Sequence, residues 1–99
     1  MSAVDTVKDA AQEAWGMTWQ DLTKRDRHVP LPFMRAVCAT VLAEQMGLTQ
    51  QEACRAVRRK LVSYPGMRRL VTDELETNPR ARRMVARLLE AMARDSHVS

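Results

Sequence analysis

The residues with the most chemical promise form a basic stretch in the second half of the chain. It runs from Arg55 to Arg69 without a single acidic residue. Its six basic side chains are Arg55, Arg58, Arg59, Lys60, Arg68 and Arg69. Guanidinium and ammonium groups along one face neutralise phosphates, which supplies most of the affinity of nucleic-acid-binding modules. A run of charge is also typical of a solvated helix face, so the stretch alone leaves both interpretations open.

The other reactive side chains form no catalytic or metal-binding motif. Cys38 and Cys54 lack the paired spacing of zinc ligands and fall within apolar helical patterns, which favours two buried thiols. His28 lies in a loop and His97 in the tail, and the carboxylates within 73–76 are typical of surface charge at a helix end. We therefore expect no enzyme, no metal and no cofactor.

The composition favours one small helical domain. We expect a single domain over 1–95 and a frayed tail at 96–99, because 99 residues are too few for two separate cores. Three glycines and four prolines leave little material for a turn-rich β fold. No apolar run approaches the roughly 20 residues that span a bilayer, and the N-terminus lacks the layout of a signal peptide. We expect a cytoplasmic protein without a membrane partner.

Capping signals and apolar spacing predict five to six helices, packed as a small all-α bundle. The first half of the chain predicts a helix over 3–15 that Gly16 ends, a short helix capped by Thr18, and a long helix over 32–47. Before the long helix, prolines 30 and 32 favour extended backbone. The segment 24–28 is therefore predicted to be a basic loop.

The second half begins with the clearest start signal of the chain. Thr49 and Glu52 have the spacing of a capping box, and Leu61 continues the apolar stripe that follows, so a helix is predicted from residue 50 to 61 or 62.

Two further helix starts follow. Ser63 is expected to cap the next helix, with Pro65 in its first turn. Asn78 and Pro79 then begin a last helix with an apolar stripe, predicted to extend to residue 94.

The two helices within 49–75, placed behind the scaffold helix 32–47, predict a helix-turn-helix. In that motif the second helix enters the major groove with its N-terminal end first, so Ser63, Tyr64 and Arg68 are expected to meet bases or phosphates. Arg68 has the fork that binds guanine through two hydrogen bonds. For Tyr64, a phosphate contact through its hydroxyl and a packing role remain equally open.

The order of these segments resembles the C-terminal DNA-binding domain of the bacterial replication initiator DnaA, a helix-turn-helix domain similar to Trp repressor. The matching residues are Trp-Gly-Met-Thr-Trp-Gln-Asp-Leu at 15–22, Lys-Arg-x-Arg at 24–27, Arg35, Leu-Ala-Glu at 42–44, Leu-Thr at 48–49, and Glu52. The resemblance covers nearly the whole chain. It implies a bacterial or phage protein whose Lys24, Arg25, Arg27 and Arg35 contact the DNA backbone and minor groove.

One departure from the family concerns base recognition. Its recognition helix opens with Asp-His-(Ser/Thr)-Thr, whereas residues 63–66 here read Ser-Tyr-Pro-Gly. No Walker-type nucleotide site is present either. The base-reading residues of the initiator are therefore missing, and a modest or different sequence preference is expected.

These observations predict a double-stranded DNA-binding protein that uses the helix-turn-helix at 49–75 and the basic loop at 24–28, in replication or transcription control. The candidate contacts are Lys24, Arg25, Arg27, Arg35, Thr49, Arg55, Arg58, Arg59, Lys60, Ser63, Tyr64, Arg68 and Arg69. The alternative is a helical module that binds another protein, and not nucleic acid, through the helix at 79–94, where Met84 and Met92 offer adaptable apolar contacts.

Overall fold

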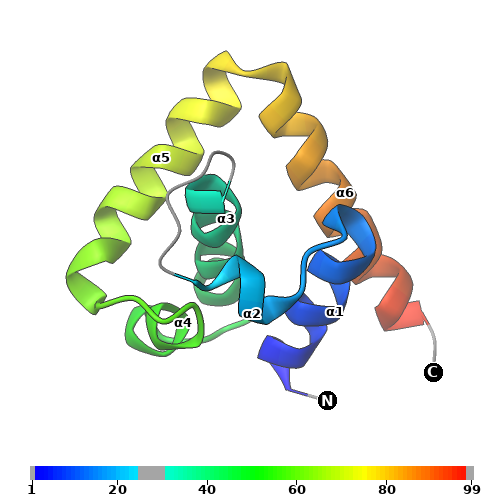
Figure 1. The fold of residues 1–99 in the computed structure, drawn as a ribbon, viewed down its shortest axis with the longest axis horizontal. Coiled ribbons are helices and arrows are strands. Elements are labelled where there is room, and N and C mark those ends of the chain that lie inside the picture. The colour runs from blue at the N-terminus through cyan, green and yellow to red at the C-terminus, as the bar shows by residue number, and fades with distance from the viewer. Residues whose placement is uncertain (1, 25–30, 98–99) are drawn as a thin grey trace.

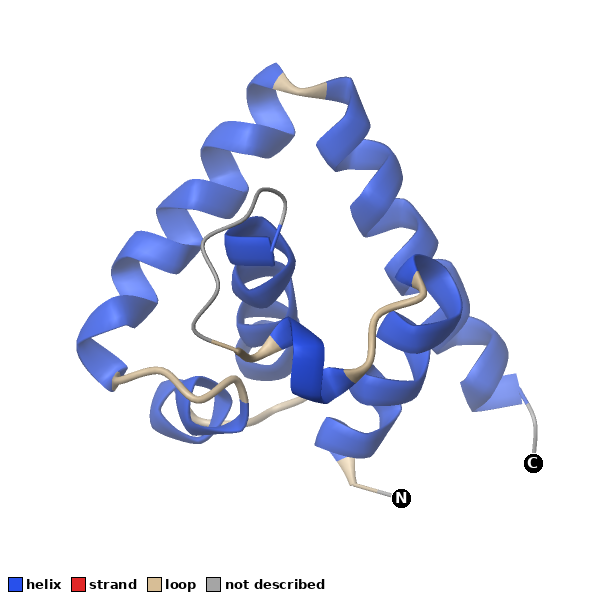
Figure 2. Ribbon diagram, viewed as in Figure 1, coloured by secondary structure: helices blue, strands red, loops and turns tan. Residues whose placement is uncertain are grey.

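The computed structural model describes residues 2–24 and 31–97, with side chains as far as residue 94. Helices make up most of these residues, and no strand occurs among them (Figure 2). The elements are α1 (Ala3–Trp15), α2 (Trp19–Leu22), α3 (Leu31–Glu44), α4 (Gln50–Ala56), the 3₁₀ turn η1 (Leu61–Ser63), α5 (Tyr64–Thr77) and α6 (Pro79–His97). The predicted all-α bundle of five to six helices is confirmed.

Helix α3 is the centre of the molecule. In Figure 1, α5 and α6 meet at their connected ends and diverge, with α3 between them and α1 beside α6. Every side chain from Phe33 to Leu42 is buried. Such a helix carries apolar residues all round because neighbours cover each of its faces. It therefore serves as the scaffold against which α1, α4 and α5 are positioned.

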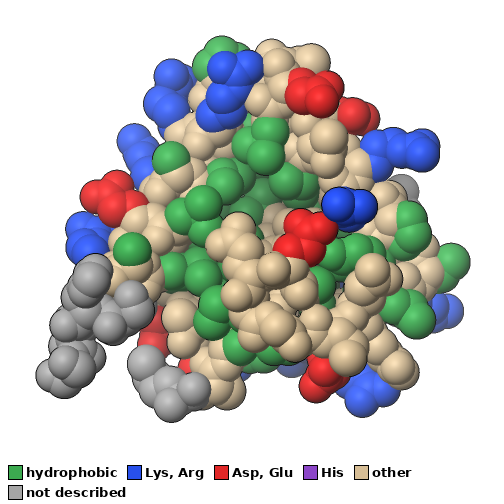
Figure 3. All heavy atoms as spheres, turned by 180° about the vertical axis from the view of Figure 1, so that it is seen from behind, with side chains coloured by type: hydrophobic (Ala, Val, Ile, Leu, Met, Phe, Trp, Pro, Cys, Tyr) green, Lys and Arg blue, Asp and Glu red, His purple; other side chains and the backbone are tan. Residues whose placement is uncertain are grey.

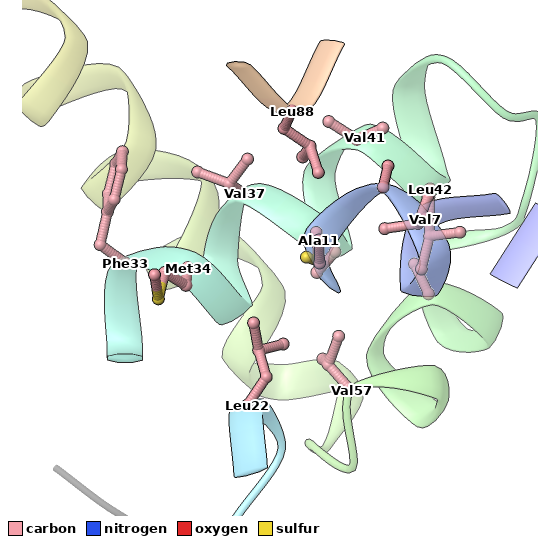
Figure 4. Packing of buried hydrophobic residues seen from close by; sticks show 14 of the residues in the cluster. Val7, Ala11, Leu22, Phe33, Met34, Val37, Val41, Leu42, Val57 and Leu88 are labelled. Atoms are coloured by element: carbon pink, nitrogen blue, oxygen red, sulfur yellow. The ribbon is translucent and has the colours of Figure 1, made fainter. Parts of the chain in front are cut away.

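The core draws on all the surrounding helices. Val7 from α1, Leu22 from α2, Val57 after α4 and Leu88 from α6 are fully buried around α3 (Figure 4). Burying a side chain of this size stabilises a fold by about 1.5–3 kcal/mol. One continuous core thus spans the described residues.

The two tryptophans pack against this core, as expected from their positions beside the helical stripes. The indole Nε1 of Trp15 donates to the Met84 carbonyl oxygen over 3.1 Å, and that of Trp19 donates to the Ala56 carbonyl oxygen over 3.1 Å. Each indole therefore joins an early helix to a distant one.

Most of the predicted helix starts and stops are confirmed. Helix α1 ends at Gly16, whose φ of 67° is the left-handed conformation that glycine adopts at low cost. The Thr18 hydroxyl caps α2, and Asn78 Oδ1 accepts a hydrogen bond from the Arg80 backbone N–H over 3.0 Å at the start of α6. Helix α6 reaches His97, past the point where the frayed tail was expected to begin.

The predicted end of the fourth helix is wrong. Helix α4 stops at Ala56 instead of residue 61 or 62. The Arg59 N–H bonds back to the Cys54 carbonyl oxygen (2.8 Å) and the Arg58 N–H to that of Arg55 (3.0 Å), which is a Schellman motif. The motif needs a left-handed residue, and here it is Arg58, with a φ of 59°. Because an arginine occupies this position in place of glycine, the sequence contains no stop signal.

Two further details of this region differ from expectation. Leu61, predicted to continue the buried stripe, begins η1 instead and is 48% exposed. The backbone of Ser63 is already helical, at φ −78° and ψ −15°, and its side chain makes no capping hydrogen bond. The connection between α4 and α5 is therefore longer and more structured than the tight turn predicted from a Ser63 cap.

Candidate nucleic-acid interface

The basic stretch lies along the end of α4, the turn 57–60 and the first turns of α5. Four of its members are exposed: Arg55, Arg58, Lys60 and Arg69. No carboxylate among the described residues lies within ion-pair distance of these four side chains. Their side chains are free to meet an anionic partner. An existing ion pair would weaken such a contact, and none of these four side chains forms one within the described part of the chain.

Arg59 ties this turn to the start of the basic loop. One guanidinium nitrogen, Nη2, donates to the Lys24 carbonyl oxygen over 3.1 Å, and Nη1 donates to the carbonyl oxygen of Arg58 over 2.8 Å. The Lys24 ammonium group pairs with Asp21 Oδ1 at 3.0 Å. Hydrogen bonds from Lys24 and the Thr18 hydroxyl lower the pKa of Asp21, so this carboxylate stays ionised. Lys24 and Arg59 therefore belong to one connected surface.

A surface hollow of about 280 Å³ adjoins this link. It is lined by Pro32, Arg35, Arg59, Ser63, Gly66, Met67 and Leu70. Residues from the N-terminal halves of α3 and α5 therefore line this hollow together with Arg59. Arg25 and Arg27, the other two predicted loop contacts, lie outside the described residues.

Arg35 has a different role from the one implied by the resemblance. It is only 6% exposed, and its Nη1 donates to the carbonyl oxygens of Leu22 (3.2 Å) and Lys24 (2.9 Å). Carbonyl groups at the end of a helix lack partners within the helix, and a buried cation satisfies them. Arg35 therefore positions the segment before the basic loop and has little surface to offer to a phosphate.

Tyr64 is a packing residue. Its side chain is 3% exposed, and burial together with the nearby Glu44 carboxylate raises the pKa of its hydroxyl. Of the two roles that the sequence left open, the phosphate contact is not supported. Tyr64 anchors the start of α5 against the rest of the fold, and Ser63 beside it remains half-buried.

Arg68 is exposed but already has a partner. Its Nε lies 2.8 Å from Oε1 of Glu44 at the end of α3, and the two side chains are 64% and 48% exposed. An ion pair this open to water is weak, so Arg68 can exchange Glu44 for a ligand. Arg69 next to it extends the positive charge of α5.

Thr49 forms the predicted capping box. The Glu52 N–H donates to the Thr49 hydroxyl over 3.1 Å, and the Thr49 N–H donates to Glu52 Oε1 over 3.0 Å. Hydrogen bonds from Thr49 lower the pKa of the Glu52 carboxyl group. The role of Thr49 that the structure describes is therefore to begin α4.

Helix α6 carries a second basic group that was not among the candidate residues. Arg80, Arg83 and Arg87 are exposed, and their spacing of three and four residues places them on one side of the helix. Arg82 is occupied differently, because its Nε donates to the Leu75 carbonyl oxygen (2.7 Å) and its Nη2 to that of Glu76 (3.0 Å), at the end of α5. The helical spacing of 80, 83 and 87 was visible in the sequence and could have identified the group.

The face seen from behind the view of Figure 1 has an apolar centre. Seen from behind, hydrophobic side chains gather in the space between α5 and α6, with arginines and lysines along the outer edges (Figure 3). A pocket of about 380 Å³ opens between α3, α5 and α6, lined by Pro32, Phe33, Leu70, Glu74, Asn78, Arg80, Ala81 and Met84. Met84 and Met92 are only partly exposed because they pack against the core.

Neither a metal centre nor a membrane span emerges from the described residues. No group of three or more potential ligands among His, Cys, Asp and Glu comes together there. Within the same residues, no helix has the length and apolar character needed to cross a bilayer. Cys38 and Cys54 are buried free thiols, as predicted.

Comparisons with protein-family models, with curated proteins and with solved structures return no match to this chain. The resemblance to the DnaA domain therefore rests on the residues quoted from the sequence.

Proposed function

We propose that this protein binds double-stranded DNA, with α4 and α5 acting as a helix-turn-helix. The observation that carries the proposal is the placement of Arg55, Arg58, Lys60 and Arg69 as exposed cations around the connection between the two helices. A docking face for a duplex requires this concentration of charge at the start of the second helix.

The basic loop is proposed to be part of the same interface. Its first residue, Lys24, is joined to the turn between α4 and α5 by Arg59. A ligand that spans the turn and the loop would meet positive charge on both. The proposed arrangement is α5 in the major groove and the segment 24–28 along the backbone, in a process such as replication or transcription control.

A salt titration of duplex binding tests the proposal. Removing one cation that binds a phosphate should reduce the slope of log K against log salt by about 0.9. Lys60→Ala is expected to weaken binding to every duplex and to lower this slope. Arg87→Ala is the matched control, because it removes an exposed charge from α6, away from the connection.

Three outcomes are distinguishable. Weaker binding in Lys60→Ala but not in Arg87→Ala supports the interface. Equal weakening by both variants points to unspecific attraction by net charge and contradicts it. If wild type binds no duplex even at low salt, the protein-binding alternative through α6 gains support.

A further inference from the structure

Leu61 and Val62 are large apolar side chains that are exposed to solvent. They are 48% and 81% exposed, and they are the large hydrophobic residues that stand out as exposed in the described part of the chain. Branched apolar side chains in water forgo the free energy that burial would supply. They lie side by side in η1, directly before α5. A partner that covers them would recover that energy.

Their surroundings indicate the chemistry of this partner. Arg58, Arg59 and Lys60 precede the pair, and Arg68 and Arg69 follow on α5. The partner must therefore be strongly anionic around an apolar patch. The major groove of DNA has this pattern, with phosphates along its rims and the C5-methyl groups of thymine on its floor.

The backbone holds the pair in a defined position. The Ser63 N–H donates to the Lys60 carbonyl oxygen over 2.9 Å, and the Tyr64 N–H bonds to the Leu61 carbonyl oxygen, which closes the 3₁₀ turn. The buried Tyr64 ring then fixes this turn to the body of the protein. A side chain that is ordered before binding loses less entropy when a ligand covers it.

We infer that Leu61 and Val62 contact thymine methyl groups in the major groove, and that the protein consequently prefers thymine-containing duplexes. This inference rests on the proposed DNA binding and adds the source of its base preference. It also supplies a reading mechanism that does not need the Asp-His-(Ser/Thr)-Thr residues missing at 63–66.

The experiment compares two duplex pools of identical random sequence, one prepared with thymine and one with uracil in its place, which differ by the C5-methyl group alone. Burial of one methyl group corresponds to about a fourfold change in affinity. Wild type is expected to bind the thymine pool at least about fourfold more tightly. Val62→Ala should lose most of this preference while keeping the salt dependence, because it removes no charge.

Two controls keep the inference separate from the proposed function. Val62→Thr keeps one methyl group and nearly the same shape, so it should retain part of the preference, and Lys60→Ala should bind both pools more weakly while retaining their ratio. Equal binding of wild type to both pools, with normal salt dependence, would overturn the inference and leave DNA binding intact. The inference would also fail if Val62→Ala weakened both pools equally. Absence of duplex binding at low salt would remove the proposed function and this inference together.

Discussion

Arg35 and Arg59 donate hydrogen bonds to the same atom, the backbone carbonyl oxygen of Lys24, over 2.9 and 3.1 Å. One guanidinium comes from the buried scaffold helix α3 and the other from the turn between α4 and α5. A carbonyl oxygen has two lone pairs and can accept both. The start of the basic loop is therefore held from two sides, and its position depends on the connection between the helices.

Removal of Arg35 should destabilise the fold. Arg35→Met keeps much of the side-chain volume but removes the donor to the Leu22 carbonyl oxygen, whereas the Lys24 carbonyl oxygen keeps its hydrogen bond from Arg59. Loss of a buried, charged donor costs about 1–3 kcal/mol for each unsatisfied group. With one carbonyl group left unsatisfied, we expect urea denaturation to show a loss of about 1–3 kcal/mol in the free energy of unfolding. Arg59→Met, at the half-buried partner, should cost less than about 1 kcal/mol, and equal losses would contradict this division of roles.

Glycine at position 58 should preserve the fold while removing one charge. The φ of 59° at Arg58 strains an L-residue, whereas glycine adopts it freely. We expect Arg58→Gly to leave the free energy of unfolding unchanged or to raise it by up to about 1 kcal/mol. Arg58→Val should lower it by about 1–2 kcal/mol, because a β-branched residue tolerates this conformation poorly. Thermal unfolding of both variants measures the contrast.

Arg58→Gly also gives a clean measure of phosphate binding. Because its fold is expected to be intact, weaker duplex binding with a smaller salt slope would be attributable to the missing charge. A melting temperature well below that of wild type would contradict the expectation that glycine adopts the left-handed conformation at residue 58 at lower cost than arginine.

The helix starts of this fold could be predicted from the sequence, whereas the end of α4 could not. Thr18, Thr49 and Asn78 are capping residues whose hydrogen bonds reach only two or three positions along the chain, so a local pattern identifies them. The end of α4 depends on a left-handed arginine, which has no signature in the sequence. The prediction of Ser63 as a cap was wrong because Ser63 is the last residue of η1, so its backbone is already helical and its side chain makes no capping hydrogen bond.

The candidate site shows the same limit. The basic residues of 55–69 were identifiable from composition alone. The burial of Arg35 and Tyr64 was not, because it depends on residues far away in sequence, such as Leu22, whose carbonyl oxygen accepts from Arg35, and Glu44, which lines a surface hollow together with Tyr64. Arginine is usually found at surfaces, so its type favoured the wrong environment for Arg35, whereas tyrosine is of intermediate burial, so the type of Tyr64 left both roles open.

The thiols of Cys38 and Cys54 should be unreactive in the folded protein. Burial raises the pKa of both thiols, which lowers the fraction of reactive thiolate. Both side chains are also inaccessible, at 0% and 1% exposure. We expect no reaction of Cys38 or Cys54 with a thiol-specific disulfide reagent in buffer, and full reaction of both in denaturant. Rapid labelling of the native protein would contradict the described packing.

Neutralising Glu44 should strengthen duplex binding with little effect on stability. Glu44→Gln breaks the ion pair with Arg68, which is exposed and contributes less than about 1 kcal/mol. The change frees Arg68 and removes a carboxylate that repels phosphates near the start of α5. Binding is therefore expected to tighten, and Glu90→Gln on the exposed side of α6 is the matched control. If both substitutions tighten binding equally, the effect reflects net charge and not the release of Arg68.

The capping box should make stability depend on pH in the acidic range. The folded protein lowers the pKa of Glu52 through hydrogen bonds from Thr49, while the unfolded chain has the ordinary value of about 4.3. A lowered folded pKa means that the stabilisation is fully present above the unfolded value and is lost as the pH falls through the folded value.

Glu52→Gln can keep a capping hydrogen bond but does not titrate. The difference in free energy of unfolding between wild type and Glu52→Gln should therefore be constant near neutral pH and should shift against wild type below about pH 4. Chemical denaturation from pH 7 to about pH 3 measures it, with the other carboxylates, including Asp21, common to both proteins. Thr49→Ala, which removes the hydroxyl acceptor, should cost about 1 kcal/mol at neutral pH. A wild-type-to-variant difference that stays flat across the acidic range would show that the Glu52 carboxylate does not stabilise the start of α4 through its charge.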